Sequence, residues 1–499
     1  MIKPFYVLTL HFLFFIQTTA QVKTASVSIA KGSRITDIKR IKNTGFVVQT
    51  HDFRGIGISG KERSLMYFNS DLHLNWNIRP LHNDQVITSP ESPYIYQLGS
   101  RPAYYERRVI ADVQYPEERS ARITRTDSYG KQDSFYVNFR ETDKKVIPLA
   151  SCIDSRNLYH LSYLPEESHV KKGFFSDKVV RAVTPVALFL RVMAHHEKDF
   201  KEKTVYLTFR EQGELNFLGC SNGLIYIYQK FLKSPQEMEF DIYAIDQDGN
   251  VKSQFSIEHK VTDFYAPLNF NRELHGTTPT VKNFQIISSQ QTNDLTYYPI
   301  LNSISDLQID FKSGRIFLYG LCNQQKSTYD SEGGRPISNF YLNIYTLDGK
   351  LLSNSYHDIT NAIKDNKTFR GHLNSYYRCV DFELLSDSLY RLNLGSRQSS
   401  FTSILLNSSN ILSYHTNDNT YDFYGELAVF DFPAEFTYKA NLSASEMESS
   451  NSYQQYLASN PVKQSKKTRY LAVNIEKQYV LIKYEKKKKD ILLTFMLFK

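Results

Sequence analysis

One sequence pattern recurs along this chain: an apolar or aromatic run, a short polar turn, and a second run in which apolar and polar residues alternate. Alternation of this kind is typical of a β-strand with one buried face, and Asp-Gly between two such runs is a strong hairpin signal. The best copy lies at residues 340–352, with Asp348-Gly349 at its turn. Further copies lie at residues 64–76, 135–144, 240–250 and 401–412. The sequence therefore predicts an all-β protein.

Neighbouring residues extend the hairpins into larger units. Apolar runs precede several of them, at residues 45–49, 215–220 and 314–320, and weaker copies are expected near residues 179–193 and 307–318. Aromatic residues make up 14% of the chain, and they favour half-buried pleated surfaces. Units of three or four consecutive antiparallel strands are predicted.

Such units bury both faces only by packing against neighbours, and a closed ring gives every sheet two neighbours. A four-stranded sheet with its loops takes roughly 45 to 70 residues, which leaves room for six or seven sheets, with six preferred. The repeated hairpins resemble the secreted β-propellers, especially the weakly repeated six-bladed kind. The resemblance covers most of the chain and implies a single β-propeller domain over residues 21–499, built of antiparallel four-stranded blades.

The end of the chain suits closure of a ring. Residues 470–474, 479–484 and 491–498 are expected to form three strands of a last sheet, and an early strand around residues 27–29 can supply the fourth. That pairing would hide the sheet edges. The polar stretch 443–467, rich in Ser, Asn and Gln, is predicted to be a surface loop.

The first twenty residues have the parts of a secretory signal peptide: Lys3, an apolar run over residues 5–16, and small residues at Thr18 and Ala20. We expect cleavage after Ala20. The apolar run is too short for the roughly twenty residues that a membrane-spanning helix needs. The predicted mature chain is therefore secreted or periplasmic, and it has no membrane span.

Charge and cysteine content exclude some classes of site. The net charge of +8 is spread over 60 basic and 52 acidic residues, which indicates a solvated surface and not a nucleic-acid partner. Cys152, Cys220, Cys322 and Cys379 show no zinc-site spacing, so no metal is expected. One or two disulfides can form in an oxidising compartment, and the pairing stays open. Cys220 and Cys322 each end a strand-like run, and we interpret both as buried small residues.

Two motifs resemble ligand loops, but simpler interpretations fit both. Residues 55–60 read Gly-x-Gly-x-x-Gly, yet a strand-like run follows at residues 65–68 where a dinucleotide site needs a helix. Residues 246–250 resemble the start of a calcium loop, but its twelfth position is Ile257, which offers no carboxylate. The first motif is interpreted as a flexible turn and the second as a hairpin turn, and no cofactor is expected.

One histidine cluster and several tyrosines are candidates for a chemical role. His195-His196-Glu197 is the densest group of potential metal ligands, but adjacent side chains diverge on a strand and no zinc motif is present, so a solvated loop end is predicted. Some tyrosines could stack on sugar rings, and we interpret them as ordinary sheet residues. They are Tyr94, Tyr96, Tyr104 and Tyr105.

Three functions remain open from the sequence. The chain contains no Gly-x-Ser-x-Gly elbow and no other catalytic signature, so no catalytic residue is assigned. This favours a binding or scaffolding module whose loops on one face recognise an extracellular or periplasmic protein, peptide or glycan. The alternative is a propeller hydrolase or lyase acting on extracellular polysaccharide, with carboxylates around a central channel. A third alternative is a structural surface component without a concave face.

Overall fold

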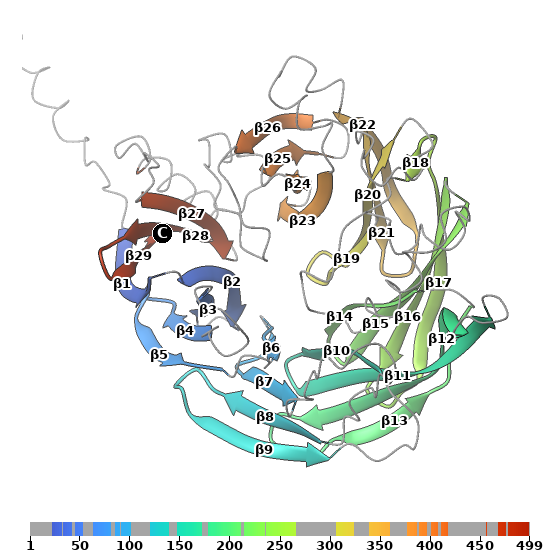
Figure 1. The fold of residues 1–499 in the computed structure, drawn as a ribbon, viewed down its shortest axis with the longest axis horizontal. Helices are drawn as coiled ribbons and strands as arrows, with labels where there is room; N and C mark the ends of the chain where they lie inside the picture. The colour runs from blue at the N-terminus through green and yellow to red at the C-terminus, as the bar shows by residue number, and fades with distance from the viewer. Residues whose placement is uncertain are drawn as a thin grey trace, which may run out of the picture. The chain divides into compact units, whose positions relative to one another are not determined.

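The chain is β-strand and turn over the residues that the computed structural model describes (Figure 1). It divides into two compact units. The smaller unit consists of Met1–Ser33, Phe68–Leu74 and Val429–Lys499, and the larger unit consists of Arg34–Tyr67 and Asn75–Ala428. The described residues are 22–31, 33–41, 45–52, 63–80, 85–89, 91–100, 120–138, 147–171, 178–210, 214–234, 236–265, 306–323, 339–359, 377–386, 389–396, 401–407, 411–417, 456, 468–475 and 478–498.

Six sheets are antiparallel meanders of strands that follow one another in the sequence. The first sheet consists of β2 (Ser33–Ile41), β3 (Gly45–Asp52), β4 (Arg63–Asn69) and β5 (Leu74–Ile78). The second consists of β6 (Gln85–Ile87), β7 (Ile95–Ser100), β8 (Ser120–Thr126) and β9 (Gln132–Asn138). The third consists of β10 (Ile147–Ile153), β11 (Asn157–Lys171), β12 (Lys178–Ala194) and β13 (Lys201–Val205). The fourth consists of β14 (Glu214–Ser221), β15 (Leu224–Ser234), β16 (Glu237–Asp246) and β17 (Val251–Lys260).

The fifth meander has a first strand in two pieces, because β18 (Phe264–Tyr265) and β19 (Asp306–Asp310) both pair with the same edge of β20 (Arg315–Asn323). Its remaining strands are β21 (Asn339–Thr346) and β22 (Leu351–Asp358). The sixth consists of β23 (Tyr377–Ser386), β24 (Leu389–Ser396), β25 (Phe401–Leu406) and β26 (Ile411–Asn417).

The seventh sheet joins the two ends of the described chain. It orders β27 (Thr468–Ile475), β28 (Gln478–Lys486) and β29 (Asp490–Phe498) beside β1 (Val22–Ala30). The register pairs Val22 with Phe498 and Ala30 with Asp490. The predicted pairing of an early strand with the last three strands is confirmed.

Successive sheets of the larger unit pack through their first strands and their faces. β6 lies beside β10, β10 beside β14, and β14 beside β19. Apolar clusters fill the space between neighbouring sheets; Leu161 and Leu190 pack with Ile225 and Ile227, for example. Four-stranded antiparallel meanders that follow one another around their first strands are the blades of a β-propeller. The described residues form six such sheets and the sheet of β1 and β27–β29, which is within the expected six or seven.

Each sheet has two unlike ends. In a four-stranded meander the first and third connections lie at one end, which we name the turn end, and the second connection and the links to the neighbouring sheets lie at the other, which we name the loop end. Turn-end connections are short, as at residues 154–156, 222–223 and 347–350. Long connections of the larger unit leave from the loop end, as at residues 101–119 and 324–338, whereas residues 266–305, the longest, separate the two pieces of the fifth sheet's first strand.

Hairpins between third and fourth strands repeat one turn geometry. Asp127 Oδ1 accepts the backbone N–H groups of Tyr129 and Lys131, each at 2.9 Å, and Asp246 Oδ1 accepts those of Asp248 and Asn250. The fourth turn residue has positive φ in both, at Gly130 and Gly249 (84° each), and again at Leu72 (65°) and Gly349 (86°). Glycine adopts this conformation without a steric cost. The interpretation of residues 246–250 as a hairpin turn is confirmed.

Most predicted hairpins are confirmed, and two expectations need correction. The copies at residues 64–76, 240–250, 340–352 and 401–412 are hairpins, as is the weaker copy at 307–318. The hairpin at residues 135–144 is wrong, because β9 is a fourth strand and pairs with β8 through the turn at Asp127. Residues 179–193 lie within one long strand, β12, and not in a hairpin.

Candidate functional site

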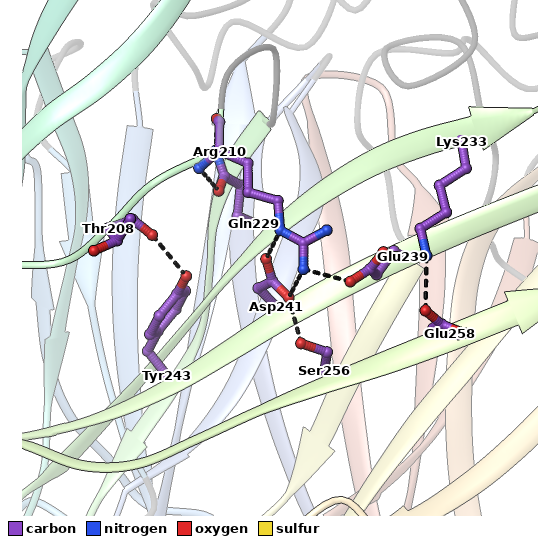
Figure 2. A network of polar contacts seen from close by, with 9 residues as sticks. All are labelled: Thr208, Arg210, Gln229, Lys233, Glu239, Asp241, Tyr243, Ser256 and Glu258. Atoms are coloured by element: carbon purple, nitrogen blue, oxygen red, sulfur yellow. Dashed lines mark hydrogen bonds and ion pairs between the residues drawn. The ribbon is translucent and has the colours of Figure 1, made fainter.

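The largest group of ionic contacts among the described side chains lies at the loop end of the β14–β17 sheet (Figure 2). Glu239 and Asp241 stand two residues apart on β16 and therefore on the same face. Their side chains are only 4% and 3% exposed. Phe240 and Ile242 alternate with them and pack into the apolar cluster on the opposite face. We name Arg210, Lys233, Glu239, Asp241, Ser256 and Glu258 the Arg210 cluster.

Arg210 binds both buried carboxylates. Its Nη2 lies 2.5 Å from Glu239 Oε1, and its Nε lies 2.9 Å from Asp241 Oδ2. The second oxygen of Asp241 also accepts the hydroxyl of Ser256 at 2.5 Å. Hydrogen bonds from a charged guanidinium offset the cost of removing these carboxylates from water.

The position of Arg210 is fixed from two sides. Its backbone N–H donates to Gln229 Oε1 at 2.8 Å, and its carbonyl accepts from Gln229 Nε2 at 2.7 Å. The guanidinium carbon lies 4.4 Å from the ring centre of Phe231, a cation–π distance. Figure 2 shows the segment around Thr208 and Arg210 lying over β15 and β16, where Tyr243 donates to the carbonyl of Thr208 at 3.3 Å.

Lys233 supplies a second cation to the Arg210 cluster. Its Nζ lies 2.6 Å from Glu239 Oε2 and 2.7 Å from Glu258 Oε1. Glu239 is therefore bound by a cation at each oxygen. The cations are partly exposed, at 45% for Arg210 and 34% for Lys233, while the two carboxylates on β16 are buried.

Electrostatics keep Glu239 ionised. Burial acts to raise the pKa of Glu239, but hydrogen bonds from Arg210 and Lys233 outweigh it, and the pKa of this carboxyl is lowered. The hydrogen bond to Glu239 raises the pKa of Arg210. A carboxyl with a lowered pKa cannot hold a proton near neutral pH, so Glu239 is unsuited to act as a general acid.

A second polar cluster lies at the turn end, around Asp154. One carboxylate oxygen accepts the backbone N–H groups of Arg156 and Asn157, at 2.8 and 2.9 Å. The other accepts the Tyr159 hydroxyl at 2.9 Å and, from the neighbouring sheet, the Gly223 N–H at 2.8 Å. Asp154 is 1% exposed. It joins the first connections of two successive blades.

His195 extends this contact to a third sheet. Its Nε2 lies 3.0 Å from the carbonyl oxygen of Asp154, and its Nδ1 lies 2.9 Å from the Tyr96 hydroxyl of the β6–β9 sheet. The imidazole is 8% exposed. The expected solvated loop end is therefore wrong for His195, because neighbouring blades cover it, whereas His196 is exposed. Burial raises the pKa of Tyr96, which stays a neutral hydrogen-bond donor.

A disulfide joins the same two sheets that Asp154 joins. Cys152 on β10 pairs with Cys220 on β14, with their Cα atoms 6.4 Å apart, within the usual range for a disulfide. The interpretation of Cys220 as a buried small residue is wrong in this respect, since it is cross-linked. The interpretation holds for Cys322, which is 0% exposed, with its sulfur 3.6 Å from the Tyr356 oxygen.

The first strands of four sheets in the larger unit are not lined by carboxylates. The side chains described on β6, β10, β14 and β19 are apolar or uncharged apart from Asp310. Asp310 instead accepts the backbone N–H groups of Lys312 and Ser313 in its own turn, each at 3.2 Å. These four strands thus bring no pair of acids together in the part of the chain that the structure describes.

Other residues that the sequence singled out are ordinary parts of the fold or lie outside the described residues. Tyr96 is a residue of β7 and 0% exposed, as expected for a sheet residue, whereas Tyr94 precedes β7 and packs against His195 with ring centres 5.2 Å apart. Tyr104, Tyr105, the motif at 55–60 and, apart from Tyr456, the stretch 443–467 lie outside the described residues.

The residues that the structure describes contain no group of three or more His, Cys, Asp or Glu side chains arranged to hold a metal ion. Among the same residues there is no helix with the length and apolarity that a membrane crossing requires.

Sequence reasoning missed both clusters. Arg210 lies 29 residues from Glu239, and His195 lies 99 residues from Tyr96, so no local motif connects them. One signal was present: Glu239 and Asp241 alternate with apolar residues in a strand that is buried throughout residues 238–245. Acidic residues at buried positions need partners, and a cation from elsewhere in the chain could have been expected.

Comparison with known proteins gave matches only among solved structures. No protein-family model matches the chain, and no curated protein matches it significantly. Prolyl oligopeptidase B from Galerina marginata is 10% identical with a TM-score of 0.39; the match covers 78% of this chain and 43% of the length of that one. The WD40 domain of SCAP from fission yeast is 8% identical with a TM-score of 0.30, over 95% and 98% of the two chains. A Trypanosoma rangeli sialidase is 9% identical with a TM-score of 0.28, over 95% of this chain and 59% of that one.

Proposed function

We propose that this chain is an exported β-propeller module that binds a protein, peptide or glycan at the loop end of its blades. The observation that carries this proposal is the asymmetry of the connections. Short turns close one end of the sheets, while long connections, such as residues 101–119 and 324–338, leave from the other. Binding residues concentrate on loops that a rigid scaffold holds in place.

The turn end supplies that rigid scaffold. Asp154, His195 and the Cys152–Cys220 disulfide connect successive sheets there. A framework held in this way loses little conformational freedom on binding, which favours affinity. We propose that residues 21–499 act together as one such domain.

A hydrolase or lyase is the less favoured function. Hydrolysis of a glycosidic bond by two carboxyl groups needs one of them protonated as the general acid. The described carboxylates that converge with an arginine are Glu239 and Asp241, and both are ion-paired. The lowered pKa of Glu239 opposes the acid role. The Arg210 cluster therefore supports the placement of a loop-end segment better than it supports acid–base catalysis.

Export is proposed on two grounds. The N-terminal twenty residues have the pattern of a cleavable signal. The Cys152–Cys220 disulfide is the kind of cross-link that persists in oxidising compartments. The expected form is a secreted or periplasmic protein that begins at Gln21.

The proposal can be tested with arrays of peptides and glycans probed with the exported chain. Any hit is measured again with a variant in which a short Gly-Ser linker replaces residues 324–338, and with a control in which Asp248 and Lys350 at the turn end are changed to Ala. We expect the loop-end variant to lose binding and the control to keep it. The reverse pattern, or turnover of a polysaccharide by the purified chain, would contradict the proposed binding role.

A further inference from the structure

The hairpin between β28 and β29 carries four consecutive lysines at its tip, Lys486, Lys487, Lys488 and Lys489. We name them the lysine turn. All four are exposed, whereas the flanking Ile482 and Ile491 are 1% and 2% exposed. The strands are therefore anchored in the core, and the charged tip stands in solvent.

The backbone of the lysine turn has a fixed conformation. Lys486 pairs with Ile491 in the β28–β29 register, and the N–H of Lys487 donates to the carbonyl of Asp490 at 2.9 Å. The four ammonium groups are held on a short, ordered hairpin, which keeps them close together.

Little negative charge balances this tip. Glu485 lies 3.1 Å from Lys483 and 3.8 Å from Lys487, and Asp490 is the other nearby acid in the sequence. The hairpin turns at Asp127 and Asp246 differ, since each contains an aspartate that accepts hydrogen bonds inside the turn. Lys23, in the same unit, is paired with Asp71. The lysine turn is thus a concentration of unbalanced positive charge.

We propose that the lysine turn docks the protein onto an anionic lipid surface. Lysine is a compact, strongly hydrated point charge, while arginine provides a planar fork for specific recognition. The tip contains neither an arginine nor an aromatic ring that could stack on a base or sugar. A fluid bilayer can gather mobile anionic headgroups around such a tip, and each lysine near the surface strengthens binding about fivefold.

The test uses the full exported chain and sedimentation with phosphatidylcholine vesicles, prepared with and without phosphatidylglycerol. We expect binding only to the anionic vesicles, with loss of binding as salt screens the charges. Changing all four lysines to glutamine should lower the partition coefficient more than about a hundredfold. Changing all four to arginine should preserve it.

A matched control changes lysines in other exposed turns, Lys131, Lys312 and Lys350, to glutamine, and should leave vesicle binding unchanged. Near-ultraviolet circular dichroism confirms that each variant is folded. Equal binding of the four-glutamine variant and the parent would overturn the proposal. So would retention on heparin that depends on the lysine turn without any binding to anionic vesicles, because it would assign the turn to a linear polyanion.

Discussion

The two ends of the β10–β13 and β14–β17 sheets hold their polar groups in different ways. At the turn end, Asp154 accepts four hydrogen bonds while almost fully buried, and a disulfide lies two residues away on β10. At the loop end, the cations of the Arg210 cluster remain partly exposed above buried carboxylates. Water can replace part of a lost contact at an exposed cation but not at a buried acceptor. Stability should therefore depend on the turn end more than on the loop end.

The largest effect is expected from the disulfide. The 68 residues between Cys152 and Cys220 correspond to about 4 kcal/mol of loop-closure entropy in the unfolded chain. The double change Cys152→Ser and Cys220→Ser should lower the free energy of unfolding by about that amount, measured by urea denaturation. Reducing agent should lower the free energy of unfolding of the parent by the same amount and leave that of the double variant unchanged. A parent whose stability does not respond to reducing agent would refute the cross-link.

Asp154→Ala should be the next most costly change. It leaves the Gly223 N–H and the Tyr159 hydroxyl without their acceptor, and burial prevents full replacement by water. We expect a loss of about 3 kcal/mol in the free energy of unfolding. Asp248→Ala, at an exposed turn position, is the control and should cost under about 0.5 kcal/mol. Equal losses for the two variants would show that Asp154 does not hold the turn end together.

Gly349→Ala tests whether turns of one sheet support the last strand of the preceding one. A Cβ at Gly349 would lie 2.5 Å from the Phe255 ring on β17, and the residue has φ of 86°. Gly223 has similar φ, 80°, but open space around the missing Cβ. Gly223→Ala should therefore lower the free energy of unfolding by about 1 kcal/mol, because only the backbone conformation is unfavourable for alanine. Gly349→Ala should lower it by about 2 kcal/mol or more, because the new methyl group also overpacks against Phe255. Equal melting temperatures of the two variants would argue against tight packing there.

Arg210→Gln examines the loop end. Lys233 would still bind Glu239 and Ser256 would still donate to Asp241, and solvent reaches the site because Arg210 is 45% exposed. We expect a loss of only about 1 kcal/mol, smaller than for Asp154→Ala. A loss as large as that of Asp154→Ala, measured in the same denaturation assay, would remove the contrast between the two ends.

Asp246 makes the stability of the turn end depend on pH. Burial acts to raise its pKa, but contacts from Lys252, Asn250 and Asp248 outweigh it and lower the pKa to about 2. A folded-state pKa below the unfolded value contributes stability above about pH 4 that is lost as the pH falls toward 2. Asp246→Asn should therefore cost about 1 kcal/mol at neutral pH, after allowance for solvent screening, and the difference from the parent should disappear near pH 2. Denaturation midpoints at several pH values measure this, and a difference that persists at pH 2 would contradict it.

Sequence patterns predicted the elements that depend on neighbouring residues. Asp348-Gly349 marks its hairpin because turn geometry is local, and the apolar runs at residues 470–474, 479–484 and 491–498, with an early strand around residues 27–29, were enough to predict the last sheet. The turn at Asp127 was missed because β8, Ser-Ala-Arg-Ile-Thr-Arg-Thr, has too few apolar residues to be recognised as a strand.

The candidate sites could not be predicted in the same way. The contacts of Asp154 with Gly223 and of His195 with Tyr96 join different sheets, so they exist only after the blades pack. The pairing of Cys152 with Cys220 likewise depends on which first strands become neighbours. Such contacts are products of tertiary structure, and the spacing of residues along the chain carries no trace of them.

The pairing of β1 with β29 has a consequence for biosynthesis. Ser26 and Thr494 lie in hydrogen-bond contact although 468 residues separate them. β1 therefore keeps an exposed edge until β29, the strand that covers it, has been synthesised. During that interval the edge can pair with the wrong strand, so the long separation of β1 and β29 along the chain makes mispairing a hazard of folding.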